Sequence, residues 1–463
     1  MEQFMETFKF VMSNFGAAIM LPVLIFVVEL FLRVPIAKAV KSAIYIGIGL
    51  NALISILNPF FLGLMGGAVQ DMVTSTGIEL PYLDTGWGIL SALSYSTSIG
   101  AAIIPVGLAV NFLLLKVRLT DTLNLDIWNY WVLAFTGSLI YYQHGSYFQG
   151  LAVAVALEIA LLLLADFTAP ICQKFFGLPN ISISHITFHG GTIVAMILRK
   201  PLELLGITKI KANSEAIRSK LGLFGDQIVV GFLVAVLIGI VAWFNRLADL
   251  ETWSNILKLG VGTGAFIYLY PKATAALLEG FRTLSDRVRE VLQNKGNDRT
   301  LHFGMDGALT VGHPDAITVG LLTMITTVAL IFLLPGNKFL MLADLGVTPF
   351  FLAAGCAVVM KGNIIASYIS TTVAVILTLY GSTIISPVFA GIAGSMGFDM
   401  ADTGAAQVGA DQRPLQSLFY FIGQSPVLVA IAIAVILGIM YVVKKKPAIS
   451  NFILGVEEPA EEA

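Results

Sequence analysis

The stretch Leu301–Gly320 combines ionisable side chains with backbone that glycine and proline interrupt, and a long apolar run follows it. It holds two carboxylates, Asp306 and Asp315, and two of the chain's five histidines, His302 and His313. Backbone within a bilayer must be helical unless it lines a cavity or packs on protein, and ionisable groups at that depth are candidates for function. We interpret this stretch as part of a binding site inside a membrane protein; a polar loop at the membrane surface is the alternative.

The composition is typical of a protein that crosses a membrane many times. Of the 463 residues, 57% are hydrophobic and 12% are charged, and the mean hydropathy is +0.86, whereas a soluble domain carries about 25% charged residues. Many apolar runs reach the roughly 20 residues that cross a bilayer as a helix. The net charge of −2 offers no basic surface for nucleic acid. Cys172 and Cys356 share no spacing that predicts a metal site or a disulfide.

We predict an all-α polytopic membrane protein with about ten or eleven transmembrane helices plus re-entrant or broken segments. Arg33, Lys38 and Lys41 follow the first apolar run, and Lys444–Lys446 follow the last. Because positive charge marks the cytoplasmic side, the N-terminus should lie outside and the C-terminus in the cytoplasm, which requires an odd number of spans. The central region Asp166–Gly225 is predicted to be a cytoplasmic loop, because six cations lie between Arg199 and Lys220.

Short motifs recur in the same order in the two halves of the chain, at separations of 212 to 222 residues. They pair Ile56–Pro59 with Tyr268–Pro271, Val106–Leu108 with Val319–Leu321, His144–Ser146 with Lys361–Asn363, and Asp84–Gly86 with Asp306–Ala308. The pattern indicates a duplicated unit, with residues 1–215 as a first repeat that includes the central cytoplasmic loop and residues 216–463 as a second repeat with a cytoplasmic tail. An odd number of spans in each unit would invert the copies, and many transporters bind substrate at the interface of such repeats.

A set of motifs extends over nearly the whole chain. They are Asn124–Asn129 with Phe135–Gly137, Ser184–His185, Leu223–Gly225, Gly304–Leu309 with Gly312–His313, Pro335–Asn337, and Lys361–Asn363. Together they resemble the galactitol-type membrane component (IIC) of the bacterial phosphoenolpyruvate-dependent sugar phosphotransferase system, in the ascorbate/galactitol superfamily. The chain departs from that family's pattern at Gly307, where proline is common, and at Gln143–His144; both departures bear on selectivity.

The resemblance implies a homodimeric transporter in the bacterial inner membrane, surrounded by lipid, that takes a polyol or related sugar from outside. It also implies that a separate cysteine-phosphorylated IIB protein, itself supplied by an IIA protein, phosphorylates the solute as it leaves on the cytoplasmic side. Related ascorbate transporters have two inverted five-helix repeats and a domain that moves like an elevator. On this basis the chain is a transport component and not an enzyme, and it needs no cofactor.

A polyol offers only hydroxyl groups, so its site needs carboxylate acceptors, amide or imidazole donors, and an aromatic face. Asp306 is the first candidate, because a carboxylate can accept hydrogen bonds from two adjacent hydroxyls; its alternative role is a helix N-cap. His185 resembles the histidine that contacts substrate in the superfamily, and an interfacial histidine in the central loop is the alternative. His189 lies four residues further on, where one helix face would bring it beside His185; a solvated side chain is the alternative.

Asp84, Thr85 and Trp87 form the first-half counterpart of the Asp306 segment, with Trp87 supplying a ring for stacking. Tryptophan also concentrates at membrane interfaces without any ligand. Asn129 and His144 are further candidates for binding the substrate.

No third ligand accompanies the two nearby histidines and no nucleophile motif is present, so the sequence predicts neither a metal site nor a catalytic residue. An ion-coupled transporter, with Asp306 and Asp84 carrying protons or sodium, is the alternative function, because broken helices and membrane carboxylates occur in both classes. A requirement for a phosphorylated cytosolic partner, rather than an ion gradient, separates the two.

Overall fold

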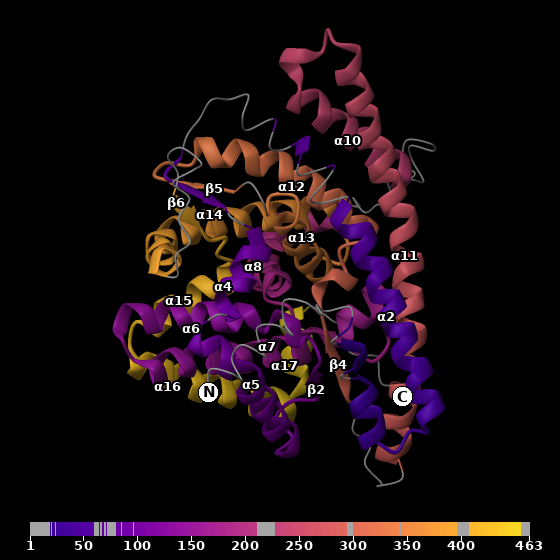
Figure 1. Ribbon diagram of the computed structural model, residues 1–463, viewed down its shortest axis with the longest axis vertical. Coiled ribbons are helices and arrows are strands. Elements are labelled where there is room, and N and C mark those ends of the chain that lie inside the picture. The colour runs from indigo at the N-terminus through magenta and orange to yellow at the C-terminus, as the bar shows by residue number, and fades with distance from the viewer. Residues whose placement is uncertain are drawn as a thin grey trace.

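The computed structural model describes residues 19, 21–23, 25–59, 64, 67–68, 71, 80–84, 86–95, 97–210, 227–293, 300–341, 344–395 and 407–454. Helices dominate this part of the chain and six short strands connect them (Figure 1). The α-helices are α2 (Ile36–Asn58), α4 (Gly86–Tyr95), α5 (Ser98–Lys116), α6 (Trp131–His144), α7 (Tyr147–Phe176), α8 (Ile186–Leu204), α10 (Gln227–Ala242), α11 (Leu250–Gln293), α12 (Pro314–Leu333), α13 (Thr348–Val359), α14 (Ile364–Ser395), α15 (Pro414–Gly423), α16 (Pro426–Lys445) and α17 (Pro447–Leu454). Single 3-10 turns are η2 (Ile127–Tyr130), η3 (Ile207–Lys209), η5 (Phe244–Arg246) and η6 (Gly307–Leu309).

Five helices in the described residues, α5, α7, α12, α14 and α16, are long and apolar enough to cross a membrane. The predicted class, an all-α polytopic membrane protein, is therefore confirmed. Several other predicted spans are shorter helices, and the predicted final span is broken between α15 and α16 at Gln424 and Ser425. All twelve residues of α13 are buried, as expected for a helix that is apolar on every side. In contrast, α16 exposes most of its apolar side chains, which suits contact with lipid.

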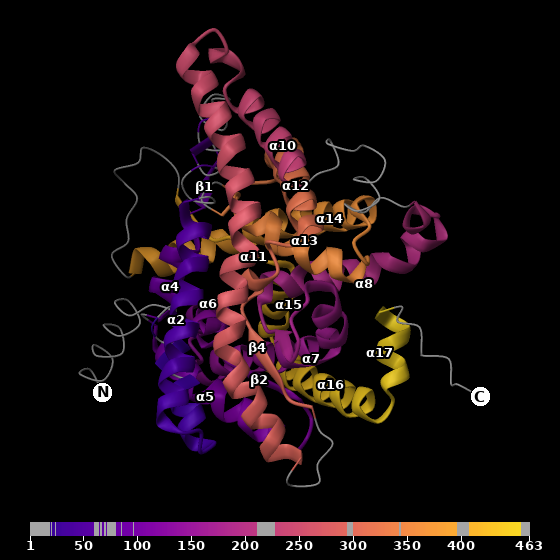
Figure 2. The same cartoon turned by 90° about the vertical axis from the view of Figure 1, so that its right-hand side faces the viewer.

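The longest helix, α11, extends along one side of the molecule for most of its height (Figure 2). It packs against α2 over much of its length and against α10 near one end. The glycine at position 280 allows the close approach, because a Cβ there would lie 2.6 Å from the Ile46 side chain. These three helices form a layer beside the other helices, which the short strands connect.

The strands form two parallel three-stranded sheets, and each sheet joins segments from both halves of the chain. In the first sheet β1 (Tyr82–Asp84) lies between β5 (Phe339–Leu340) and β6 (Gln407–Gly409); in the second, β4 (His302–Met305) lies between β2 (Thr122–Asn124) and β3 (Ile181–Ile183). The central strand of each sheet therefore comes from one half and its two neighbours come from the other. Such pairing supplies hydrogen bonds to backbone that is not helical, which a membrane interior requires.

Gly107 and Gly320 occupy the same place in the motif that recurs in the two halves, and their packing contacts are alike. A Cβ on Gly107 of α5 would lie 2.6 Å from the ring of Tyr130, and one on Gly320 of α12 would lie 2.5 Å from the ring of Phe350. In each half, a glycine of an apolar helix thus packs closely against an aromatic ring at or next to the start of a short buried helix, α6 or α13. Small residues allow this close packing between membrane helices.

Two further features occur at the same separation of 217 residues. Gly145 directly after α6 and Gly362 shortly after α13 both adopt left-handed backbone, with φ of 67° and 76°. Pro170 lies inside α7 and Pro387 inside α14. The short helix, the left-handed glycine and the long proline-containing helix therefore follow one another in the same order twice.

The prediction that Asp166–Gly225 forms a loop was wrong for its first part. Here α7 continues to Phe176, β3 follows, and α8 buries most of its residues up to Ala195. The six cations that suggested a loop all lie at or beyond Arg199, whereas Ile186–Leu198 of α8 contains no lysine, arginine, aspartate or glutamate and is mostly apolar. Lys211, Arg218 and Lys220 lie outside the described residues.

The crossing of α8 and α13 depends on glycine. A Cβ on Gly355 would overlap the carbonyl oxygen of Phe188, and one on Gly191 would overlap that of Leu352. We expect Gly355→Ala to destabilise the protein by roughly 1–3 kcal/mol, because the two helices must separate. The measurement is the Tm of the purified protein in detergent.

Gly438→Ala is the matched control, since nothing lies within 4 Å of a Cβ at this position of α16. Alanine is favoured over glycine in a helix by roughly 0.5–1 kcal/mol, so this variant should keep or slightly raise the Tm. Equal Tm values for the two variants would contradict the packing described for α8 and α13.

Candidate functional site

Polar side chains gather where the three strands of the second sheet end. Asp306 follows β4, Asp126 and Asn129 follow β2, and His185 follows β3. Because the strands are parallel, their carboxyl ends lie at one edge, which is where ligands bind in parallel sheets generally. We call Asp306, Asn129, Asp126 and His185 the second-sheet cluster.

Asp306 is both a cap and an accessible carboxylate. Its Oδ1 accepts a hydrogen bond from the backbone nitrogen of Ala308 at 2.9 Å, and its Oδ2 accepts one from Nδ2 of Asn129 at 3.0 Å. His185 Nε2 lies 3.7 Å from Oδ1. The Asp306 side chain remains 36% exposed, so capping η6 leaves the carboxylate open to a ligand.

His185 faces Asp306 with its donor nitrogen. Its Nδ1 accepts a hydrogen bond from the backbone nitrogen of Phe188 at 3.5 Å, which leaves the Nε2 proton directed to the carboxylate. Burial lowers the pKa of His185, although the charge of Asp306 opposes the shift. The imidazole is therefore neutral at pH 7 and can donate one hydrogen bond to a hydroxyl or to Asp306.

Asn129 links two carboxylates. Its Nδ2 donates to Asp126 Oδ1 at 2.8 Å and Oδ2 at 3.0 Å, in addition to Asp306. Burial and the charge of Asp306 raise the pKa of Asp126, while the Asn129 hydrogen bond opposes them. The ring of Phe351 lies 4.7 Å from that of His185 and supplies an aromatic surface beside these polar groups.

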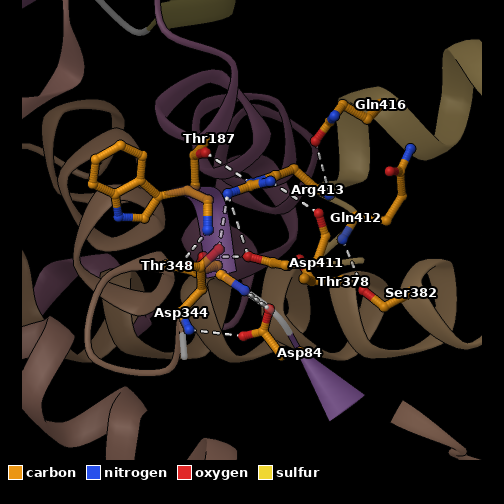
Figure 3. Close-up of polar contacts among 12 residues, drawn as sticks. Asp84, Thr187, Asp344, Thr348, Thr378, Ser382, Asp411, Gln412, Arg413 and Gln416 are labelled. Carbon is orange, nitrogen blue, oxygen red and sulfur yellow. Dashed lines mark hydrogen bonds and ion pairs between the residues drawn. The ribbon is translucent and has the colours of Figure 1, made fainter. Parts of the chain in front are cut away.

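A second group of polar residues lies at the carboxyl ends of the first sheet (Figure 3). Asp84 is the last residue of β1, Asp344 follows β5, and Asp411 and Arg413 follow β6. We call these four residues the first-sheet cluster. Asp84 accepts hydrogen bonds from the backbone nitrogens of Gly86 at 2.9 Å and Asp344 at 2.7 Å, so it holds the segment after β5 against the segment after β1.

Arg413 lies at the centre of the first-sheet cluster, where Figure 3 shows it between Thr187 and the carboxylates. Its Nε donates to Thr187 at 3.1 Å and its Nη1 to the carbonyl oxygen of Asp411 at 2.9 Å. Its Nη2 lies 3.6 Å from Asp344 Oδ2 and 3.5 Å from Asp411 Oδ2. The arginine thus connects segments that follow β3, β5 and β6.

The first-sheet cluster holds three buried carboxylates and one buried guanidinium. Burial and the charges of Asp344 and Asp411 raise the pKa of Asp84. Burial also raises the pKa of Asp344 to about 7, although Arg413 opposes the shift. The single cation therefore does not balance the carboxylates, and protonation near neutral pH relieves the excess charge.

The structure brings together three of the sequence-predicted candidates, Asp306, His185 and Asn129, in the second-sheet cluster. Asp84 belongs instead to the first-sheet cluster, where the backbone nitrogen of Trp87 donates to Asp344 at 3.1 Å. Thr85 lies outside the described residues.

The two remaining histidine candidates lie away from the second-sheet carboxylates. His189 is fully buried and its Nε2 pairs with the carbonyl oxygen of Ile183 at 2.7 Å, behind His185. His144 is exposed at the end of α6 opposite to the cluster, where it pairs with Gln424 at 3.0 Å. His144 therefore lies apart from the second-sheet cluster, and its motif marks the end of a helix that the left-handed Gly145 terminates.

Four polar residues of the two clusters were missed as candidates: Asp126, Asp344, Asp411 and Arg413. Each lies within four residues after the end of a short strand, and a sequence signal existed only for Asp126, which lies within a recognised motif. Within the described residues, no three His, Cys, Asp or Glu side chains are placed to hold a metal ion.

Buried polar clusters at the ends of two sheets, surrounded by membrane-length helices, define a polytopic membrane protein with polar groups in its interior. The chain matches the family EIIC-GAT, described as the PTS system sugar-specific permease component, over residues 10–404. This chain therefore belongs to that family of permeases of the sugar phosphotransferase system.

Similar proteins in Escherichia coli agree with this membership. A relative in strain K12, described as a permease IIC component, is 31% identical over 404 residues, covering 87% of this chain and 90% of the relative. The galactitol-specific EIIC components of strains K12 and O157:H7 are 29% identical over 381 residues, covering 82% of each chain. The family is a transport component without catalytic activity of its own, and it works with a sugar or polyol substrate and a IIB partner.

Removal of Arg413 should make stability depend strongly on pH. The pKa of Asp344 is raised by folding from its ordinary value of 3.8 to about 7, so between these pH values the folded protein keeps a proton that the unfolded chain releases. The contribution of this carboxyl group to the free energy of unfolding is therefore complete below pH ~4 and is lost as the pH rises through ~7. Arg413→Gln removes the only cation of the cluster and should cost roughly 3–5 kcal/mol at pH 8. The loss of stability should be smaller at pH 5, where a proton on the carboxylates takes the place of the arginine charge. The Tm of the variant at both pH values measures the difference.

Arg246→Gln serves as the control. Arg246 pairs with Asp71 at 3.1 Å, and both side chains are about half exposed, so the pair is worth below about 1 kcal/mol. This variant should lower the Tm little and equally at both pH values. An equal loss of Tm at pH 5 and pH 8 in Arg413→Gln would contradict the charge imbalance described above.

Proposed function

We propose that the chain carries galactitol or a closely related neutral polyol and binds it at Asp306, Asn129 and His185. The observation that carries this proposal is the partly exposed Asp306 carboxylate, with the amide of Asn129 and the neutral imidazole of His185 beside it. The names of two relatives supply the solute. The proposed occupant is uncharged, because the cluster already holds two carboxylates and no free cation.

The chemistry of the three side chains suits adjacent hydroxyl groups. A carboxylate accepts hydrogen bonds from two neighbouring hydroxyls, and bonds to a charged acceptor are stronger than neutral ones. The imidazole and the amide each donate to a hydroxyl oxygen, and the ring of Phe351 offers an apolar face to the C–H edge. Asp84, Trp87 and His189 are proposed to support the site from the first sheet and from behind His185, and Thr85 is proposed to act with Asp84.

We also propose that residues 1–215 and 216–463 are two inverted repeats, with the substrate bound at their interface. Three observations support it: the exchange of strands between halves, the matching glycine–aromatic contacts, and the paired positions of Gly145 with Gly362 and Pro170 with Pro387. In this arrangement Asp84 and Asp306 are counterparts, since Asp84 ends β1 and Asp306 directly follows β4, and these are the central strands of the two sheets. Movement of one group of helices relative to the other would then give alternating access of the elevator type.

The remaining proposals concern the membrane and the partners. The N-terminus lies outside the bacterial inner membrane and the C-terminus in the cytoplasm, on the basis of Lys444–Lys446 and the other cations. The permease acts as a homodimer. The IIB protein docks on the cytoplasmic side, where lysine and arginine side chains are concentrated. It transfers its phosphoryl group to a hydroxyl of the bound polyol.

The experiment is uptake of labelled galactitol by the full chain in vesicles, with and without a phosphorylated IIB partner. Uptake should require the partner and yield phosphorylated galactitol. Asp306→Asn removes one acceptor and the charge, and should reduce uptake at low galactitol concentration by about tenfold or more, since a hydrogen bond to a charged group is worth roughly 1.5–3 kcal/mol.

His144→Ala is the matched control, because His144 is exposed and distant from the cluster, and it should transport like the unaltered protein. Uptake that follows a proton or sodium gradient without the partner would overturn the coupling. Unchanged uptake by Asp306→Asn would overturn the proposed site.

A further inference from the structure

Glu158 is a buried carboxyl group for which the proposed function has no use. It lies near the middle of α7, a helix of membrane-spanning length, and is fully buried. Within the described residues no lysine, arginine or histidine forms an ion pair with it. An ionisable group at such depth is costly, and it persists where it has a defined partner.

The partners of Glu158 are side chains of the segment that leads from β2 into the second-sheet cluster. Nδ2 of Asn124 donates to Oε1 at 3.0 Å and lies 3.3 Å from Oε2, and the hydroxyl of Tyr130 donates to Oε1 at 3.0 Å. Asn124 ends β2 and Tyr130 ends η2. Glu158 therefore holds both ends of the short segment that contains Asp126 and Asn129.

The hydrogen bond to Glu158 also fixes which way the Asn124 amide points. With its nitrogen directed to the carboxyl group, its Oδ1 accepts from the backbone nitrogen of Asp126 at 3.0 Å and from the hydroxyl of Ser184 at 2.8 Å. Ser184 directly precedes His185. One amide thus joins the segment carrying Asn129 to the segment carrying His185, and Glu158 determines its orientation.

A second carboxylate of α7 provides a comparison. Asp166 accepts from the hydroxyl of Thr122 at 2.8 Å and from the backbone nitrogen of Asp121 at 3.0 Å, at the start of β2, and lies 3.8 Å from Lys444. Both carboxylates therefore hold the same strand to the same helix. Only Glu158 lies at the end of the strand that carries the cluster.

We infer that Glu158 is a positioning residue of the substrate site: through Asn124 and Tyr130 it sets the placement of Asn129 and His185 relative to Asp306. It does not touch the substrate. This inference rests on the proposed function, since it assumes that the polyol binds at Asn129, His185 and Asp306.

The test is the galactitol dependence of uptake by the full chain in vesicles with the phosphorylated IIB partner, together with the Tm of each variant. Glu158→Ala leaves the Asn124 amide without its acceptor and should raise KM roughly tenfold, the factor that corresponds to about 1.4 kcal/mol. Glu158→Gln keeps an acceptor oxygen and should stay within about threefold of the original KM. Asp166→Asn, the matched control, should change KM by less than about twofold.

A double variant separates positioning from a general loss of stability. If Glu158 acts partly through Asn129 and partly through Ser184 and His185, then adding Glu158→Ala to Asn129→Ala should raise KM by no more than about threefold beyond Asn129→Ala alone, because coupled residues are not additive. A full tenfold further increase in KM would overturn the inference.

The two failures are distinguishable. A normal KM in Asn129→Ala would overturn the proposed site itself, whereas an impaired Asn129→Ala with a normal KM in Glu158→Ala would overturn only the positioning role. If Glu158→Ala does not fold, Ser184→Ala cuts the same connection by removal of one hydroxyl. It should raise KM about threefold, and an unchanged KM would overturn the inference.

Discussion

The hydrogen-bonding requirement of backbone that leaves the helical conformation is the constraint on which this structure depends. Such backbone inside a bilayer protein must find partners within the protein. In the described part of the chain, six strands of two to four residues meet this need, and each is paired with a strand from the other half. Short strands of this kind are not stable alone, so the surrounding helices and the pairing stabilise one another.

The exchanged pairing also explains where the polar clusters lie. Parallel strands end at a common edge, so residues distant in sequence, such as Asp84 and Asp411, or Asn129 and Asp306, become neighbours. The two edges differ in chemistry. The first-sheet cluster is bound together by Arg413, whereas the second-sheet cluster has amide and imidazole groups around an accessible carboxylate. A cation held in place by ion pairs suits a structural role, whereas a carboxylate that can accept further hydrogen bonds suits the binding of a ligand.

Composition and periodicity were sufficient to predict the membrane class, since 12% charge and long apolar runs allow no soluble alternative. Asp306 and Asn129 could be selected as candidates because each lies in a polar segment that interrupts apolar sequence, and His185 because it resembles a histidine of the superfamily. The strand pairing was not predictable: strands of three residues carry almost no periodicity, and their partners lie far away in sequence. For this reason Arg413 and Asp344 looked like ordinary loop residues. Charge misled the interpretation of α8, because cations at one end of a helix were attributed to the entire region.

The exchange of strands has a consequence for biosynthesis. β1 emerges early from the ribosome, but its neighbours β5 and β6 lie beyond residue 338, and at about 5–20 residues per second their synthesis follows only after some tens of seconds. During this interval the N-terminal half lacks the two strands that pair with β1. The contact order of the fold is therefore high, and neither half, expressed as a separate polypeptide, would possess a complete sheet. Complementation would require both fragments to meet in the same membrane before either is degraded.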